Sequence, residues 1–290
     1  MKQLLLLILL CSFGSSIALI QPKNADEKFL VVVTASYNNV KWYKDNVDSV
    51  LSQQGHENWH WIYVDDASPD GTGERVERYV AQKGMESHVT LIKNKKRVGA
   101  LANQFKATYM VPDDAVILIL DGDDRFAHND VFKIINEVYS NEDVWFTYGQ
   151  FRYMKRGQVG ECKPFPQKVI DTNTFRKSGQ PSHLRTYYAG LFKRVQLADL
   201  MLKGDFFKMS NDIATLYPMI EMARHHFKFI STILYDYNDM NELNNHRLNW
   251  KYQFANAKLI KQRAPYDTIE SPFWYPDGDP IANGTTAGSK

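Results

Sequence analysis

The stretch Phe29–Thr34 (FLVVVT) is an unbroken apolar run rich in β-branched residues, and the polar turn residues 35–38 (ASYN) follow it at once. A run without polar alternation is typical of a strand that is buried on both faces, as in a parallel sheet. Residues 115–120 (AVILIL) repeat the pattern and lead directly into residues 121–124 (DGDD). Two buried strands that each end in a polar turn predict an open α/β sheet with a ligand site at the strand ends.

The segments around these two runs alternate in a βαβ rhythm. We expect strands at 59–64 and 89–92 and helices at 40–53, 73–83 and 100–109. Beyond residue 130 we expect helices at 131–139, 195–202 and 213–227, strands at 144–153 and 229–237, and a long loop over 155–182. The predicted fold class is therefore α/β, with a mixed, mostly parallel Rossmann-like sheet flanked by helices. Residues 264–290 are rich in Pro, Gly and Thr, which predicts an extended or disordered tail.

Composition excludes several classes of protein. With 44% apolar residues the 290-residue chain has the material for a real core, so global disorder is excluded. Lys plus Arg number 35 and Asp plus Glu 33, and this net charge of +2 argues against nucleic acid as a partner. The two cysteines are Cys11 and Cys162, and because Cys11 lies in an apolar leader, no disulfide framework is expected.

The leader is the apolar segment 4–20, which follows Lys2. Residues 16–18 (SIA) fit cleavage of a secretory signal after Ala18, but the segment is also long enough for an uncleaved membrane anchor. We therefore assign residues 1–22 to a signal peptide or an anchor, so that the protein is either membrane-tethered through its N-terminus or exported. No other segment is long and apolar enough to span a bilayer, which excludes a polytopic transporter or synthase.

Carboxylates gather at the carboxyl edge of the predicted sheet. Asp65 and Asp66 follow the second strand, and Asp121, Asp123 and Asp124 follow the fourth. Successive side chains of a strand alternate, so Asp121 and Asp123 point the same way, and such hard oxygen ligands suit Mg²⁺ or Mn²⁺. The alternative is a solvated turn, because Asp and Gly are common turn residues.

Four motifs in order resemble the inverting family 2 glycosyltransferases, which have the GT-A fold. They are residues 36–38 (SYN), 64–72 (VDDASPDGT, similar to the family's VDDGSTDGT), Asn94 with 97–100 (RVGA) and Asn103, and 120–124 (LDGDD, similar to LDADD). The resemblance covers roughly residues 29–130. It implies a GT-A domain over 27–263, with a nucleotide-sugar-binding half at 27–130 and an acceptor half at 131–263. It also implies transfer with inversion from a nucleotide-sugar, in particular a UDP-sugar, to a glycan, lipid or protein acceptor.

The nucleotide is expected to lie over the turn after the first strand. Backbone groups of Ala35 and the ring of Tyr37 can meet a planar base, and Asp66 can accept a hydrogen bond from the base edge. The resemblance implies that Asp65 shapes the same pocket. Tyr37 as a core aromatic and Asp65 as a turn residue are the structural alternatives.

Three further residues of the matched motifs are expected to bind the donor. The resemblance implies that Arg97 contacts the diphosphate or the sugar, and that Asn103 and Gly122 belong to the donor site. The alternative for Arg97 is an ordinary solvated basic run at 95–97 (KKR).

In the second half, the resemblance implies a catalytic base at the start of a helix. The matching segment is 210–215 (SNDIAT), in which Asn211 replaces the family's usual Glu, so Asp212 is the predicted base. Its alternative is a purely structural helix N-cap. The segment 182–190 (SHLRTYYAG) is predicted to face the acceptor, where His183 and Arg185 contact the acceptor or the diphosphate.

The resemblance also implies a divalent ion, Mn²⁺ or Mg²⁺, held mainly by Asp123 with Asp121 or Asp124 assisting. His246 is a further predicted metal ligand, with a surface-loop histidine as its alternative.

Other functions would require different sequence features. A sugar nucleotidyltransferase would need a Gly-rich loop, and residues 31–38 contain no glycine. A processive synthase would need several spans and a QxxRW motif, and neither is present. A catalytically silent carbohydrate- or nucleotide-binding module on the same fold stays open as the alternative. Because nucleotide-sugars must be present where the enzyme works, the predicted chemistry favours a membrane tether over free secretion.

Overall fold

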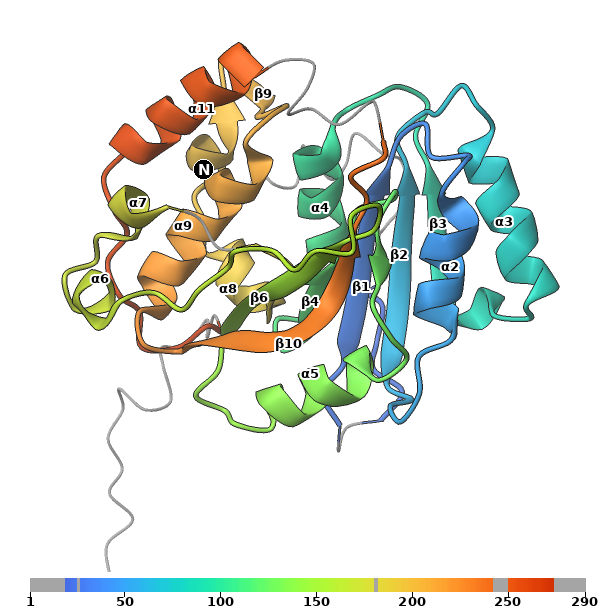
Figure 1. The fold of residues 1–290 in the computed structure, drawn as a ribbon, viewed down its shortest axis with the longest axis horizontal. Helices are drawn as coiled ribbons and strands as arrows, with labels where there is room; N and C mark the ends of the chain where they lie inside the picture. Colours follow the sequence, from blue (N-terminus) through green and yellow to red (C-terminus); the bar gives the residue numbers. More distant parts are fainter. Residues whose placement is uncertain (1–18, 25–26, 180–181, 242–249, 274–290) are drawn as a thin grey trace, which may run out of the picture.

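A mixed eight-stranded sheet forms the centre of the molecule (Figure 1). The structure is a computed structural model that describes residues 19–24, 27–179, 182–241 and 250–273. The strands of the sheet are β1 (Leu30–Ser36), β2 (Trp59–Asp65), β3 (Val89–Lys93), β4 (Val116–Ile119), β5 (Arg125–Phe126), β6 (Phe146–Tyr153), β7 (Arg185–Tyr188) and β10 (Phe227–Tyr237). Their order in the sheet is β3-β2-β1-β4-β7-β6-β10-β5. Strand β7 is antiparallel to β4 and β6, and β5 is antiparallel to β10, whereas the other neighbours are parallel. The predicted fold class is confirmed.

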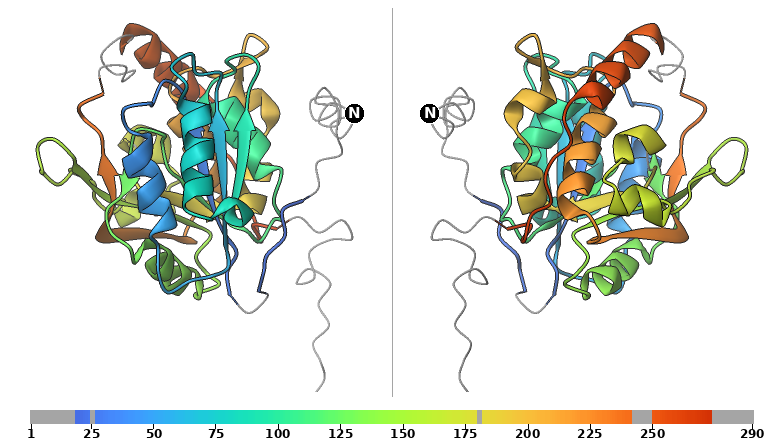
Figure 2. Two further views of the ribbon diagram at one scale, coloured as in Figure 1. Left: turned by 90° about the vertical axis from the view of Figure 1, so that its right-hand side faces the viewer. Right: turned by 90° about the vertical axis from the view of Figure 1, so that its left-hand side faces the viewer.

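Helices cover both faces of this sheet (Figures 1 and 2). One face carries α2 (Tyr43–Leu51), α3 (Thr72–Gln82) and α5 (Val131–Tyr139), and the other carries α4 (Ala100–Thr108), α8 (Ala189–Lys193) and α9 (Asn211–Ala223). Helix α11 (Trp250–Gln262) packs on α9. The smaller elements are the 3₁₀ turns η1 (Glu86–His88) and η2 (Leu197–Leu200), helices α6 (Gln167–Asp171) and α7 (Phe175–Ser178), and the hairpin of β8 (Met201–Leu202) and β9 (Asp205–Phe206).

The register of the parallel strands sets the position of the polar turns. Leu30 of β1 pairs with Trp59 of β2 and with Val116 of β4, so the three strands start together; β1 and β2 also end together, and β4 ends opposite Val33. The amide of Asp66 donates to the carbonyl of Ser36 at 2.8 Å, which continues the β1–β2 pairing into the turns. Because parallel strands end at one edge, the motifs that follow β1, β2 and β4 meet there, as predicted.

The second half of the chain differs from its prediction in two segments. The helix expected at 195–202 is wrong, because the chain forms η2 and then β8. Lys203 and Gly204, both at positive φ, make the tight turn into β9. The loop expected over 155–182 contains the short helices α6 and α7, and Phe175 of α7 is fully buried.

Several elements were not predicted, and β7 and α11 are the two of greatest consequence for the site and the second half. Strand β7 lies within the segment 182–190 that was predicted as an acceptor-facing loop, and it occupies the centre of the sheet. Helix α11 was missed because its sequence follows no clear apolar stripe.

The predicted tail begins with a docked, extended segment. Residues 264–273 contain no helix or strand, yet the amide of Ile269 donates to the carbonyl of Met222 at 3.1 Å, and Ser271 is buried. Residues 264–273 are thus extended and packed against the rest of the chain. Among the described residues, no helix has the length and apolarity to cross a membrane. The leader at 1–18, the rest of the tail at 274–290 and His246 lie outside the described residues.

Candidate active site

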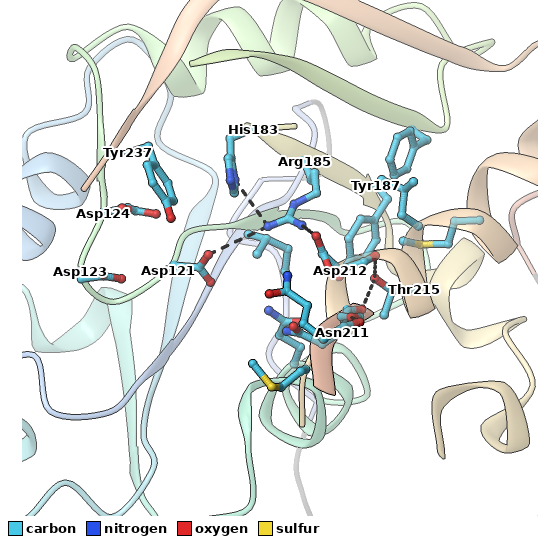
Figure 3. A pocket seen from close by; sticks show the side chains of 18 residues that line it. Asp121, Asp123, Asp124, His183, Arg185, Tyr187, Asn211, Asp212, Thr215 and Tyr237 are labelled. Carbon is cyan, nitrogen blue, oxygen red and sulfur yellow. Dashed lines mark hydrogen bonds and ion pairs between the residues drawn. The ribbon is translucent and has the colours of Figure 1, made fainter. Parts of the chain in front are cut away.

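Two adjoining cavities open at the carboxyl edge of β1 and β4. The outer cavity, of about 680 Å³, lies between the turn after β1, the loop 97–100 and the segment 208–211. The inner cavity, of about 160 Å³, lies behind it against β7 and α9 (Figure 3). Asp121, Asp123, Met209 and Asn211 line both cavities, so one continuous site connects the two halves of the chain.

The DGDD turn is fixed by contacts that only these residue types permit. A Cβ at Gly122 would lie 2.6 Å from Cβ of Ser36, so the close approach of this turn to β1 requires glycine. Asn46 of α2 donates through Nδ2 to the carbonyl of Asp121 at 3.0 Å and to that of Asp124 at 2.7 Å. The turn is therefore held rigid from the side opposite the cavities.

The three aspartates of this turn have different surroundings. Asp124 is 2% exposed and accepts hydrogen bonds from the hydroxyl of Tyr235 and the amide of Asn238, each at 2.6 Å. Both its oxygens are engaged with β10 and the residue that follows, which gives Asp124 a structural role, and its assistance to a metal stays a prediction. Asp123 accepts one hydrogen bond, from Nδ2 of Asn241 at 2.7 Å, and Asp121 keeps a side chain that is 37% exposed.

The pKa values of Asp121 and Asp123 are both raised, which shows that the positive charge near the two carboxylates does not compensate for their burial. The pKa of Asp123 is raised to about 6, mainly by burial and in part by the charge of Asp121, although the hydrogen bond from Asn241 opposes the shift. Burial also raises the pKa of Asp121, although Arg185 opposes this shift. A cation between the carboxylates would relieve their repulsion, and carboxylate oxygens are the ligands that Mg²⁺ and Mn²⁺ prefer. The residues present therefore fit a divalent ion, and its binding by Asp121 and Asp123 stays a prediction.

No group of three His, Cys, Asp or Glu side chains able to hold a metal exists among the described residues. A divalent ion at Asp121 and Asp123 would thus complete its coordination with water or substrate oxygens, which is the usual arrangement for Mg²⁺. The predicted ligand His246 lies outside the described residues.

The predicted base faces the inner cavity. Helix α9 begins at Asn211, and Ser210 precedes it in the left-handed region with φ 59°, so Asp212 is the second residue of the helix and not its N-cap. Oδ2 of Asp212 lies 3.9 Å from a guanidinium nitrogen of Arg185, and another nitrogen of Arg185 lies 4.0 Å from Asp121 (Figure 3). Arg185 therefore stands between the DGDD turn and the predicted base.

Arg185 is itself held by β7 and by His183. Nδ1 of His183 lies 3.4 Å from the Arg185 guanidinium, and the His183 ring stacks on Tyr235 with centroids 4.4 Å apart. Burial, with the nearby positive charge of Arg185, lowers the pKa of His183 well below its usual range, so the ring is neutral at physiological pH. The prediction that His183 and Arg185 belong to the site agrees with this position, because both line the inner cavity.

Asp65 and Asp66 have different positions and different hydrogen-bond partners. Asp66 lines the outer cavity, and its carboxylate accepts from the amides of Val98 and Gly99 at 2.9 and 2.8 Å and from Nδ2 of Asn94 at 2.9 Å. Asp66 therefore organises the loop 97–100 in addition to any contact with a ligand. Asp65 lines neither cavity and accepts from the amide of Ser68 at 3.2 Å, which favours the turn role that was its alternative.

The other predicted donor-binding residues line the outer cavity. They are Ala35, Tyr37, Arg97, Asn103 and Gly122. The Arg97 guanidinium lies over the Tyr37 ring, 3.7 Å from its centroid, on a face where a base would stack. Arg97 must therefore move aside to admit a base on that face.

Sequence reasoning missed Lys208, which lines the outer cavity, and Met209, which lines both cavities. No motif marks them. Their only sequence signal is that they immediately precede the segment that contains Asp212.

Comparison with known proteins gives the same family as the resemblance. The sequence profile described as "Glycosyl transferase family 2" matches residues 31–200. A putative teichuronic acid biosynthesis glycosyltransferase, TuaG, from Bacillus subtilis (strain 168) is 30% identical over 102 residues. That match covers 35% of this chain and 38% of TuaG, so the chain spans well under two thirds of its curated relative.

Solved structures show the same fold. S. aureus TarS in complex with UDP-GlcNAc superposes with a TM-score of 0.59 at 14% identity, covering 80% of this chain and 65% of that one. The mannosyltransferase PcManGT from Pyrobaculum calidifontis, in complex with GDP-Man and Mn²⁺, gives a TM-score of 0.54 at 16% identity, covering 91% and 73%. At these identities the likeness concerns the fold alone.

Proposed function

The chain belongs to glycosyl transferase family 2, and on that premise we propose that it transfers a sugar from a nucleotide-sugar to a hydroxyl acceptor, with inversion at the anomeric carbon. The observation that supports this most is the position of Asp121, Asp123 and Asp212 around one continuous site. A silent binding module would not need a carboxylate at the start of α9 that faces the same site.

In the proposed reaction, Asp212 accepts the proton of the acceptor hydroxyl. The hydroxyl oxygen forms a bond to the anomeric carbon, and the bond from that carbon to the diphosphate oxygen breaks, so that the nucleoside diphosphate leaves with the electron pair. Attack from the face opposite the leaving group inverts the anomeric configuration. Arg185 orients the Asp212 carboxylate, because its guanidinium lies 3.9 Å from Oδ2 of Asp212.

The donor is proposed to occupy the outer cavity. Its base would meet Tyr37 and backbone groups of Ala35, while Asp66 holds the loop 97–100 that forms the opposite wall. Asp121 and Asp123 would hold a divalent ion, Mn²⁺ or Mg²⁺, which when bound neutralises charge on the diphosphate. We propose UDP as the nucleotide. TarS holds a UDP-sugar and PcManGT a GDP-sugar, so both nucleotides are to be tested.

The acceptor is proposed to approach the inner cavity, where Asp212 lies beside Thr215 and Tyr187. A glycan, a lipid or a protein each carries suitable hydroxyl groups. The apolar segment 4–20 is proposed to tether the protein to a membrane or to direct its export, and fractionation of cells that express the full chain tests this proposal.

Incubation of the full chain with UDP- and GDP-sugars, in the presence of Mn²⁺, Mg²⁺ or EDTA, tests the proposed function. We expect nucleoside diphosphate release that EDTA abolishes, and NMR of the product should show the anomeric configuration opposite to that of the donor. Asp45→Asn is a matched control, because Asp45 is an exposed carboxylate of α2 that lines neither cavity. A retained configuration, or turnover of no donor by the folded protein, would contradict the proposal.

A further inference from the structure

Lys208 spans the mouth of the outer cavity. Its Nζ donates to the carbonyl of Val98 at 2.7 Å, which joins two segments 110 residues apart in the chain. Gly99 allows this approach, since a Cβ there would lie only 3.3 Å from Cδ of Lys208. The lysine thus connects the loop that Asp66 holds to the segment that leads into α9.

The backbone of Lys208 is fixed although its side chain is exposed. Phe207 and Met209 on either side are 1% and 6% exposed, so they anchor the chain in the core and leave Lys208 to project over the cavity. Ser210 then donates through Oγ to the carbonyl of Gln253 at 2.9 Å, and α9 begins at the next residue. Lys208 therefore projects from a backbone segment that continues directly into α9, the helix that carries Asp212.

The charge of Lys208 has no counter-charge in the part of the chain that the structure describes. The recorded partner of its ammonium is a neutral carbonyl, and no carboxylate of the described residues forms an ion pair with it. The other cation that lines the outer cavity, Arg97, lies against the Tyr37 ring. An ammonium at a cavity wall that is held only by a carbonyl is suited to exchange that partner for an anionic ligand.

We propose that Lys208 binds the diphosphate of the donor and of the released nucleoside diphosphate, and that it thereby positions the Asp212 segment when the donor is present. This inference rests on the proposed function. On binding, Nζ leaves the Val98 carbonyl for a phosphate oxygen, and the wall formed by Met209 and Asn211 settles against the donor. Lys208 is a binding and positioning residue, and Asp212 keeps the chemical role.

Calorimetric titration with UDP and with uridine, in the presence of Mn²⁺, tests the inference. The Lys208→Met variant loses one charge-assisted contact, so its affinity for UDP should fall about 10- to 100-fold. Its affinity for uridine should stay at the wild-type level. Lys208→Arg, which keeps the charge, should restore most of the UDP affinity. Lys203→Met is the matched control, because Lys203 is an exposed lysine of the β8–β9 turn that lines neither cavity.

The outcomes separate the inference from the proposed function. UDP affinity of Lys208→Met equal to that of the wild type, with both proteins folded by circular dichroism, would overturn the inference alone. Equal weakening of UDP and uridine would also overturn it, because a merely structural role would not distinguish the diphosphate. Wild-type protein that binds neither UDP nor GDP would overturn the proposed function together with the inference. In steady-state assays the lysine variant should raise the KM for the donor and leave the KM for the acceptor unchanged.

Discussion

The two halves of the molecule place their functional groups by different means. In the half that we propose binds the nucleotide, residues 27–130, backbone ladders between neighbouring strands bring the motifs together, and main-chain amides fix the carboxylate Asp66. In the half that we propose binds the acceptor, residues 131–263, a side-chain ion pair joins distant segments. Arg176 of α7 forms a bidentate pair with Glu221 of α9, at 2.6 and 2.7 Å, and both side chains are buried.

This difference matters because the acceptor half carries the predicted base. The Arg176 guanidinium also donates to the carbonyl of Ile260 in α11 at 2.7 Å, and Glu221 accepts from the amide of Tyr266 in the docked tail. One buried pair thus joins α7, α9, α11 and residues 264–273. The orientation of α9, and with it Asp212, depends on contacts that no local sequence pattern encodes.

The largest effect on stability is expected where this pair is broken. Arg176→Met leaves the Glu221 carboxylate buried without its partner, which should lower the free energy of unfolding by about 3–5 kcal/mol. Urea unfolding, monitored by circular dichroism, measures this free energy of unfolding. The double variant Arg176→Met/Glu221→Leu removes both charges and should recover much of the loss. If the single variant is as stable as the wild type, the ion pair does not hold the acceptor half together.

The corresponding change in the nucleotide-binding half should cost less stability. Asp66→Asn keeps the volume but replaces one acceptor oxygen with an NH₂ group that faces backbone N–H donors, for an expected cost of about 1–3 kcal/mol. It should also weaken UDP binding, because the loop 97–100 loses its anchor. Asp65→Asn is the matched control, since Asp65 lines neither cavity, and it should bind UDP as the wild type does. Equal losses of UDP binding in the two variants would contradict the division of roles between Asp65 and Asp66.

These two halves were also predicted from the sequence to different degrees. The buried runs of β1 and β4 and their polar ends identify the parallel strands and the DGDD turn, because an unbroken apolar run that ends in a polar turn is a local sequence pattern. Strand β7 was missed because its four residues (RTYY) lie between β4 and β6 only through tertiary pairing. The bridging position of Arg185 follows from β7, and so sequence reasoning could place it near the site but not between Asp121 and Asp212.

A further expected effect concerns acid sensitivity within residues 27–130. Burial, followed by the charges of His88 and Lys23, lowers the pKa of His60 from 6.5 to about 4. The unfolded chain therefore takes up a proton below pH 6.5 while the folded protein does not, so the stability that is complete above pH 6.5 is lost as the pH falls to about 4.

Unfolding experiments between pH 7 and 4 on His60→Gln measure this contribution, which cannot exceed about 1.4 kcal/mol per pH unit. The variant should show a shallower decline than the wild type. The pKa of His183 in the acceptor half is lowered as well, so a residual decline is expected. A decline of unchanged slope in His60→Gln would show that this histidine does not contribute.

The central claim is that the two halves supply separate functions to one reaction, and paired variants test it most directly. UDP binding in the presence of Mn²⁺ and the rate of sugar transfer are measured for Asp123→Asn and for Asp212→Asn. We predict that Asp123→Asn loses the Mn²⁺-dependent part of UDP binding together with transfer. Asp212→Asn should bind UDP as the wild type does but transfer sugar about 10²- to 10⁴-fold more slowly. Unimpaired transfer by Asp212→Asn, or wild-type Mn²⁺-dependent UDP binding by Asp123→Asn, would contradict the account.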